Sequence, residues 1–300
     1  MNLTDIETFL TIVETRNITK TAESLFVTQP TVSRRLQNLE EEIGFELIRR
    51  KKGIKQIELT DKGEAFVLVA ERWISVWQEL NQIRLKDSST LLTVSSVDTF
   101  NTAVLANIYR DLMENADSKI KLHIQTHHSA TIYRLVEQRQ VDIGFVLFNL
   151  NYKNVNVKPI AREKMYIVQR DCDAALHYLR LHTDDLEDRT EIHFRGDINF
   201  ENWHSQWISY GNISPIYVDT YALLQQLLSL DRTWTIVPAS VAEQLRKDMP
   251  VIVSQITNEI APPDRVVYCI THKNISKTIS QAAKQFEKAV AAYVTERNWL

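Results

Sequence analysis

The sequence predicts a multidomain protein: an α-helical N-terminal domain, a long linker helix and a two-lobed α/β domain. Apolar residues recur at helical spacing between Leu3 and Ile43, and a seven-residue apolar repeat follows between Phe66 and Ile83. Beyond residue 90, strand-like and helix-like segments alternate. Because 300 residues approach the upper limit for one hydrophobic core, more than one domain is expected.

The N-terminal domain is expected to begin with two helices. The first has one buried face, made by Leu3, Ile6, Phe9, Leu10 and Val13. The second begins near Asn17 or Thr19, since either side chain can cap a helix. It is predicted to direct three apolar side chains inward, namely Ala22, Leu25 and Phe26.

A third helix is predicted to start at Gln29 after a tight turn. Pro30 suits its first turn, where the missing N–H has no partner to lose. The helix buries a face made by Val32, Leu36, Leu39 and Ile43. Its outer face therefore offers side chains that can hydrogen-bond to base edges and phosphates, namely Gln29, Thr31, Ser33, Arg34 and Gln37.

A short two-stranded hairpin with a basic tip is predicted after Gly44. Apolar positions alternate on both sides of Gly53, and the tip carries five cations, namely Arg49, Arg50, Lys51, Lys52 and Lys55. Residues 1–60 contain nine basic and nine acidic residues, but the acids at 40–42 and 46 lie apart from both basic clusters. This segregation of charge is what a surface that faces phosphates requires.

These residues together resemble the winged helix-turn-helix of LysR-type transcriptional regulators. The resemblance rests on the run from Thr28 to Ser33, on Leu39 with Glu40, on Gly44, and on Leu59 with Thr60, and it covers about the first sixty-five positions. It implies sequence-specific binding to double-stranded DNA. The family's DNA-contacting positions correspond to Gln29, Thr31, Ser33, Arg34 and Arg50, with Thr28 and Lys52 as further positions.

The linker helix is expected to span residues 61–86. Phe66, Trp73 and Leu80 lie seven apart, and Val69, Val76 and Ile83 form a second series offset by three, which are the a and d positions of a coiled coil. This seam favours pairing with a second copy of the chain. The alternative is an amphipathic helix that packs onto its own domain. Asp87 to Thr90 end the helix and form a hinge.

The C-terminal two-thirds is expected to form parallel α/β units. Strands are predicted at 91–96, 119–126, 141–148, 165–169, 191–194, 215–218, 234–238 and 266–271. The predicted domains are 1–60 for DNA binding, 61–90 for the linker, and 91–300 for a two-lobed domain. In that domain, the first lobe is expected at 91–162 and 265–300, and the second at 163–264.

In LysR-type proteins this region resembles the type 2 fold of periplasmic binding proteins and holds a small-molecule effector between its lobes. The resemblance implies effector contacts from Ser96, Thr99, Ser129, Phe148, Phe194, Trp203 and Thr220. Helix capping is the alternative role for each hydroxyl. Asp98 lies beside Thr99 and would repel an anion unless it turns away or pairs with Lys164 or Arg265.

Several chemistries are not expected. Six glycines occur, and none has the spacing of a dinucleotide or phosphate loop. Cys172 and Cys269 are interpreted as structural thiols, a sensing role for His127 and His128 is left open, and His123 with His127 lacks the spacing of a zinc site. We therefore expect no catalytic residue, no metal and no cofactor.

The function predicted is a cytoplasmic, LysR-type, DNA-binding transcriptional regulator modulated by an effector of unknown identity. The partners implied are operator DNA, a second copy of the chain as a dimer or tetramer, the effector and RNA polymerase, without a membrane. One alternative is a ligand-binding protein that does not regulate DNA directly, and another is an enzyme on the two-lobed scaffold. A gel shift and a turnover assay separate these readings.

The basic hairpin generates a prediction for DNA binding. Arg50→Ala should weaken binding to all duplexes and lower the salt slope by about 1, because a phosphate contact carries no sequence information. Gln29→Ala should lose mainly base preference. Titration against operator and random duplexes at several salt concentrations checks both, and an unchanged preference in Gln29→Ala contradicts its assignment to base readout.

Overall fold

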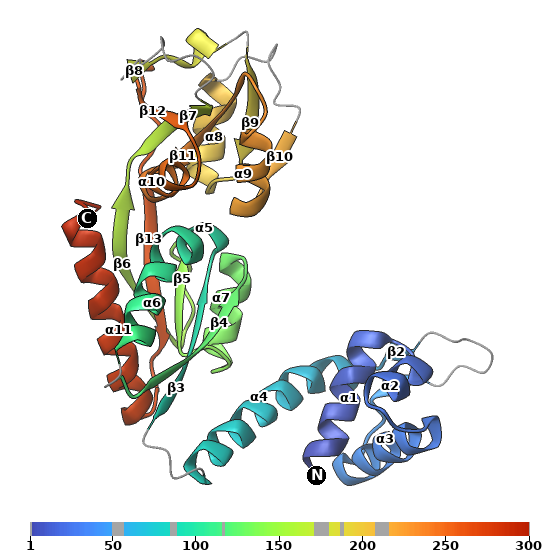
Figure 1. Ribbon diagram of the computed structural model, residues 1–300. Coiled ribbons are helices and arrows are strands. Elements are labelled where there is room, and N and C mark those ends of the chain that lie inside the picture. Colours follow the sequence, from blue (N-terminus) through green and yellow to red (C-terminus); the bar gives the residue numbers. More distant parts are fainter. Residues whose placement is uncertain are drawn as a thin grey trace. The chain divides into compact units, whose positions relative to one another are not determined.

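The computed structural model describes residues 2–49, 57–84, 89–115, 118–170, 180–186, 189–207 and 216–299. These residues form two compact units (Figure 1). The first comprises the described residues before 89 together with Gln138–Gln140, and the second comprises the rest. None of the helices in these ranges is long and apolar enough to cross a membrane.

The first unit has three short helices, a two-stranded hairpin and one long helix. The elements are α1 (Leu3–Thr15), α2 (Ile18–Ser24), α3 (Gln29–Ile43), β1 (Ile48–Arg49), β2 (Glu58–Leu59) and α4 (Asp61–Arg84). The Asn2 and Asn17 side chains cap α1 and α2, and Pro30 lies in the first turn of α3. The helix-turn-helix and the antiparallel hairpin predicted from the sequence are both confirmed.

The core of this unit gathers one face from each helix. Phe9, Leu36 and Phe66 are fully or almost fully buried, and the rings of Phe9 and Phe66 lie 5.5 Å apart. The inward placement of Phe26 was wrong, since its side chain is 95% exposed. The helical period no longer applies there, because α2 ends at Ser24 and Phe26 adopts a left-handed φ of 53° in the turn before α3.

Gly63 allows a close approach between α4 and the hairpin. A Cβ atom at this position would lie 2.1 Å from the carbonyl oxygen of Leu47. The Gly63 N–H also donates to Thr60 Oγ1 at 2.9 Å, and the Thr60 hydroxyl donates to the Glu46 carbonyl at 2.8 Å. A glycine at this point therefore sets how the first turn of α4 meets the strand before it.

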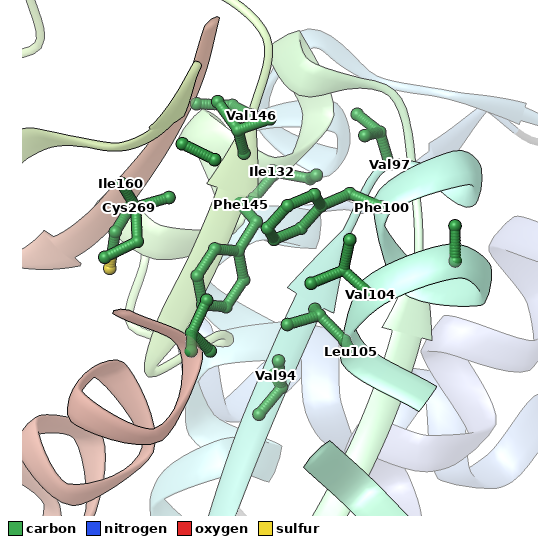
Figure 2. Close-up of a cluster of buried hydrophobic side chains, with 14 of the residues drawn as sticks. Val94, Val97, Phe100, Val104, Leu105, Ile132, Phe145, Val146, Ile160 and Cys269 are labelled. Atoms are coloured by element: carbon green, nitrogen blue, oxygen red, sulfur yellow. The ribbon is translucent and has the colours of Figure 1, made fainter. Parts of the chain in front are cut away.

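The first lobe of the second unit is a five-stranded sheet in the order β4-β3-β5-β13-β6. Its strands are β3 (Thr90–Ser96), β4 (Ile120–Thr126), β5 (Ile143–Val146), β6 (Val155–Glu163) and β13 (Arg265–His272). Its helices are α5 (Asp98–Phe100), a π-helical segment (Asn101–Leu105), α6 (Ala106–Glu114), α7 (Ser129–Glu137) and α11 (Lys277–Glu296). Phe100 and Phe145 meet at the centre of its core (Figure 2).

The second lobe is a six-stranded sheet in the order β10-β9-β11-β7-β12-β8. Its strands are β7 (Met165–Arg170), β8 (Arg180–Leu181), β9 (Thr190–Phe194), β10 (Ile216–Val218), β11 (Thr233–Pro238) and β12 (Val251–Ile256). A 3-10 turn (Thr183–Leu186) and three helices complete it, namely α8 (Ile198–Trp207), α9 (Tyr221–Leu228) and α10 (Ala239–Asp248).

Both sheets are mixed, which corrects the expectation of purely parallel units. Strands β3, β4 and β5 are parallel, but β13 runs antiparallel to both β5 and β6. The reason is the path of the chain, since β6 carries it out of the first lobe and β13 brings it back at the same end (Figure 1). Two neighbouring strands that leave and return at one end must run in opposite directions.

The contact at Gly63 generates a stability prediction. Gly63→Ala should lower the free energy of unfolding by about 1–3 kcal/mol, because the added methyl group meets a backbone carbonyl that cannot give way. Gly44→Asn is the matched control, since Gly44 has a φ of 81° with open space around it and asparagine tolerates this conformation. Urea unfolding measures both variants, and equal effects would contradict the argument.

Candidate DNA interface and effector cleft

The outward face of α3 presents the polar residues that the sequence singled out. Thr28, Gln29, Ser33 and Arg34 are exposed, and Thr31 is half-buried. Thr28 and Thr31 are joined through their hydroxyl groups at 2.9 Å. The predicted contacts at positions 50 and 52 lie outside the described residues.

The amide of Gln29 is held by a hydrogen bond that it donates to the preceding helix. Its Nε2 donates one N–H to Thr19 Oγ1 at 3.0 Å. The second N–H and the carbonyl oxygen have no partner among the described residues, and this donor and acceptor are the pair that a glutamine uses on the N7 and N6 of adenine. The bond to Thr19 thus orients Gln29 without consuming the groups that read a base.

A buried carboxylate joins α3 to the hairpin. Glu40 accepts the backbone N–H groups of Leu47 and Ile48 at 2.7 and 3.3 Å. In the sequence, Glu40 counted as part of the family resemblance and as an acid distant from the basic clusters, and its contact with the hairpin was not predicted. The helical period was the available signal, because Glu40 follows Leu39 and adjoins the buried face. Its bonds fix where the hairpin begins relative to α3.

The apolar seam of α4 divides between two surroundings. Phe66 belongs to the core of its own unit, and Trp73 packs against that core. Val69, Val76 and Leu80 are 54%, 56% and 43% exposed, whereas the side chain of Ile83 lies outside the description. Part of the seam therefore packs on its own domain, and Val69, Val76 and Leu80 form an exposed apolar stripe.

A small cavity lies between the two lobes of the second unit. Its volume is about 30 Å³, enough to hold water but far below the roughly 300–1,000 Å³ of an ordinary small-molecule pocket. Its lining is mostly apolar, and its charged residues are Arg195, Asp197 and Arg265. The lining residues from the first lobe and the crossing strands include Thr99, Leu147 and Arg265, and those from the second lobe include Met165, Phe194 and Phe200.

The guanidinium of Arg265 holds the two lobes together at the point where β6 and β13 cross between them. It pairs with Glu163 through Nε, at 2.9 Å, and through Nη2. It also donates to Thr99 Oγ1 at 2.9 Å and to Ser240 Oγ at 3.0 Å. The second oxygen of Glu163 accepts the Ser240 N–H at 2.9 Å. Each charge is therefore buried with partners on both lobes.

A second bond crosses the cleft from Asp98. Its carboxylate accepts the backbone N–H of Tyr221 at 2.6 Å and so caps the start of α9, where the Thr220 side chain makes no capping bond. A negative charge is favourable at a helix N-terminus. Asp98 thus turns away from the cavity and contacts neither Lys164 nor Arg265, the cations that the sequence suggested.

The cavity brings together two of the seven predicted effector residues, Thr99 and Phe194. Ser129 is buried, and its hydroxyl accepts the Leu147 N–H at 3.1 Å. The Trp203 indole donates to the Ile260 carbonyl at 2.8 Å. The remaining three residues, Ser96, Phe148 and Thr220, do not line the cavity either. The Ser96 hydroxyl is buried and has no hydrogen-bond partner within the described ranges.

Arg195 also lines the cavity, and it lies in the stretch from Phe194 to Trp203 from which effector contacts were expected. It follows β9 directly, is exposed, and forms no ion pair with the described part of the chain. Asp197, also in the lining, is occupied as a cap, because its Oδ1 accepts the N–H groups of Asn199 and Phe200. The position of Arg195 at the carboxyl end of a strand was the signal for that expectation.

The environments of one cysteine and one histidine can be described. Burial, and then the charge of Glu287, raises the pKa of the Cys269 thiol, which disfavours the reactive thiolate. Position 172 lies outside the described residues. Burial, and then the charges of Arg134 and His128, lowers the pKa of His127.

The fold and these sites define a winged helix-turn-helix unit linked to a two-lobed ligand-binding unit. Residues 3–64 match the bacterial regulatory helix-turn-helix protein, lysR family, and residues 86–293 match the LysR substrate binding domain. The chain belongs to the LysR family of bacterial regulators.

Relatives and solved structures agree with this assignment. The HTH-type transcriptional regulator CitR of Bacillus subtilis is 30% identical over 182 residues, which cover 56% of this chain and 61% of CitR. The transcriptional activator IlvY of Haemophilus influenzae is 31% identical over 149 residues, 48% of this chain and 49% of IlvY. The chain thus matches about half of each relative's length.

The structure of CbnR, described as a LysR family transcriptional regulator, has the same fold. Its TM-score is 0.71 at 20% identity, with 97% of this chain and 99% of CbnR covered.

The Arg265 network generates a stability prediction. Arg265→Met should lower the free energy of unfolding by about 3–5 kcal/mol, because Glu163 would keep a buried charge without its partner. Lys158→Met is the matched control, since Lys158 pairs with Glu287 at the surface and such pairs contribute about 0–1 kcal/mol. Denaturant unfolding compares them, and similar losses would refute the role of the buried pair.

Proposed function

We propose that the protein is a sequence-specific transcriptional regulator that binds double-stranded DNA through its first unit and a small-molecule effector through its second. The observation that carries the DNA-binding proposal is the exposed polar face of α3, on which the Thr19 bond orients the Gln29 amide. A helix with this face enters the major groove N-terminal half first and reads base edges. The hairpin beside it would contact the phosphate backbone.

The relatives support this proposal. CitR is named as a transcriptional regulator and IlvY as a transcriptional activator. A solved structure titled as full-length CbnR complexed with its target DNA has a TM-score of 0.69 to this chain. We infer the same class of partner here, double-stranded DNA.

The exposed stripe on α4 supports assembly with a second copy of the chain. Val76 lies seven positions after Val69, and Leu80 lies four positions after Val76, so the three residues share one side of the helix, where apolar exposure is unfavourable in a monomer. Pairing two such helices would bring two α3 helices to half-sites separated by one or more turns of DNA. A dimer is therefore the smallest assembly that we propose.

The cleft supports an effector that is small, largely apolar and anionic at one end. Arg265 and Asp197 are already occupied, so Arg195 is the cation that can meet an anionic group. Because a volume of about 30 Å³ is far below that of an ordinary small-molecule pocket, the lobes must open or side chains must move before an effector enters. Opening would break the Asp98 bond to Tyr221. If this bond forms again when the lobes close on a ligand, ligand binding is coupled to the arrangement of the lobes.

A selection experiment tests DNA reading. Duplexes enriched from a random library by the wild-type protein should share an adenine in each half-site that Gln29→Ala no longer selects, because the bidentate amide contact discriminates by about 1–3 kcal/mol. Gln285→Ala makes the same change at an exposed position on α11 and should select the wild-type sites. No enrichment by the wild type would refute DNA reading.

A thermal-shift screen tests the cleft. Small carboxylates and their matched amides are compared, and a carboxylate at a hundredfold excess over its Kd should stabilise the protein by about 2.7 kcal/mol. Thr99→Ala and Arg195→Gln should lose this stabilisation, whereas Arg246→Gln on the exposed side of α10 should keep it. Equal stabilisation of Arg195→Gln would contradict the anion-binding role.

A further inference from the structure

A cluster of histidines and carboxylates lies in the second lobe, between β9 and α8. Glu191 and His193 are two positions apart on β9, so their side chains leave the same face of the strand. Glu201 and His204 are three positions apart on α8, so they share one face of that helix. The two faces meet, and all four side chains are in contact.

Three ligand atoms from this cluster converge on one point. His204 Nε2 lies 2.7 Å from Glu191 Oε1 and 3.1 Å from His193 Nδ1, and the latter two atoms are 3.7 Å apart. All three residues offer their atoms within 4.8 Å of one another. With metal–ligand bonds of about 2.0–2.1 Å, the edge of a ligand tetrahedron is roughly 3.3 Å. The three observed distances, 2.7, 3.1 and 3.7 Å, lie around that value.

The second nitrogen of His193 has the partner that metal-bound imidazoles usually have. Its Nε2 lies 2.9 Å from a carboxylate oxygen of Glu201, which fixes the proton on Nε2 and turns the lone pair of Nδ1 toward the convergence point. Glu201 is itself held, because its Oε1 accepts the Gly196 N–H at 2.7 Å. Glu201 therefore holds His193 from behind, and His193 in turn presents its Nδ1 beside the ligand atoms of Glu191 and His204.

Because Glu191 is buried, bulk water contributes little to the stabilisation of its negative charge. Glu191 and His193 are 4% and 1% exposed, so little water reaches the carboxylate. A buried carboxylate needs a cation or several donors to compensate for lost hydration. Phe200 stacks on the His193 ring with centroids 6.2 Å apart, and Tyr217 meets it edge-on at 4.9 Å, which closes the sides of the site.

We propose that Glu191 Oε1, His193 Nδ1 and His204 Nε2 bind one divalent transition-metal ion of the zinc type, with Glu201 as the residue that orients His193. Two imidazole nitrogens and one carboxylate oxygen suit zinc and its first-row neighbours and not calcium or magnesium, which prefer oxygen ligands. The inference stands apart from DNA and effector binding, since none of these four residues lines the cavity.

The position of the site assigns it a structural role beside the cleft. Phe194 follows His193, Phe200 precedes Glu201, and both phenylalanines line the cavity. An ion that joins β9 to α8 would hold these two rings at fixed positions in the cleft wall. The spacing searches of the sequence could not detect the set, because its members lie on a strand and a helix whose contact only the fold establishes.

Metal titration of the chelator-stripped full chain tests the proposal. Zn²⁺ should bind at about one ion per chain in competition with a chromophoric chelator, and Co²⁺ should produce the intense visible absorption of a four-coordinate nitrogen and oxygen site. His204→Gln should abolish both signals. Glu201→Gln should weaken Zn²⁺ binding by about 10–100-fold, the effect expected for a residue that orients a ligand.

The matched control is the double variant His123→Gln/His127→Gln, which removes two exposed histidines of the first lobe. It should bind Zn²⁺ as the wild type does. The proposal is overturned if the wild type takes up no stoichiometric metal, if His204→Gln binds as tightly as the wild type, or if the control variant loses the ion. Circular dichroism of each variant establishes that lost binding does not reflect lost folding.

Discussion

The buried pair of Arg265 and Glu163 is the interaction on which the two-lobed unit depends. The two residues are partners on adjacent strands at the point where the chain passes between the lobes, so the pair joins the strand that leaves the first lobe to the strand that returns. Burial of both charges is tolerated because Thr99 and Ser240 supply further hydrogen bonds, one from each lobe. Removal of any member would leave a buried polar group without its partner.

The hydrogen bonds between the lobes determine how the lobes can separate. Arg265 makes four hydrogen bonds at the crossing point, whereas Asp98 accepts one, from the backbone N–H of Tyr221. Separation of the lobes at the Asp98 bond therefore breaks fewer of these hydrogen bonds than separation at the crossing point. A ligand can shift the balance of lobe arrangements only through its different affinity for them, and the proposed anion contact of Arg195 is one source of such a difference.

In the first unit, neighbouring elements hold the outward face of α3 in place. Glu40 ties α3 to the start of the hairpin, and the lack of a side chain at Gly63 lets α4 pack against the same segment. The exposed α3 face is thus carried on elements that support one another. The same helix α4 packs inward through Phe66 and keeps Val69 and Val76 exposed, so one helix contributes both to the core and to the surface proposed for assembly.

The sequence by itself determined the local elements and the family, because helix periods, caps and turn residues act between near neighbours. Asn17 and Pro30 marked helix starts that the structure confirms. The tertiary structure alone decided the mixed direction of β13, the exposure of Phe26 and the lining of the cleft. Arg265 meets a glutamate 102 positions away, and Glu191 and His193 meet His204 across two elements. Such contacts depend on chain topology, which no local pattern encodes.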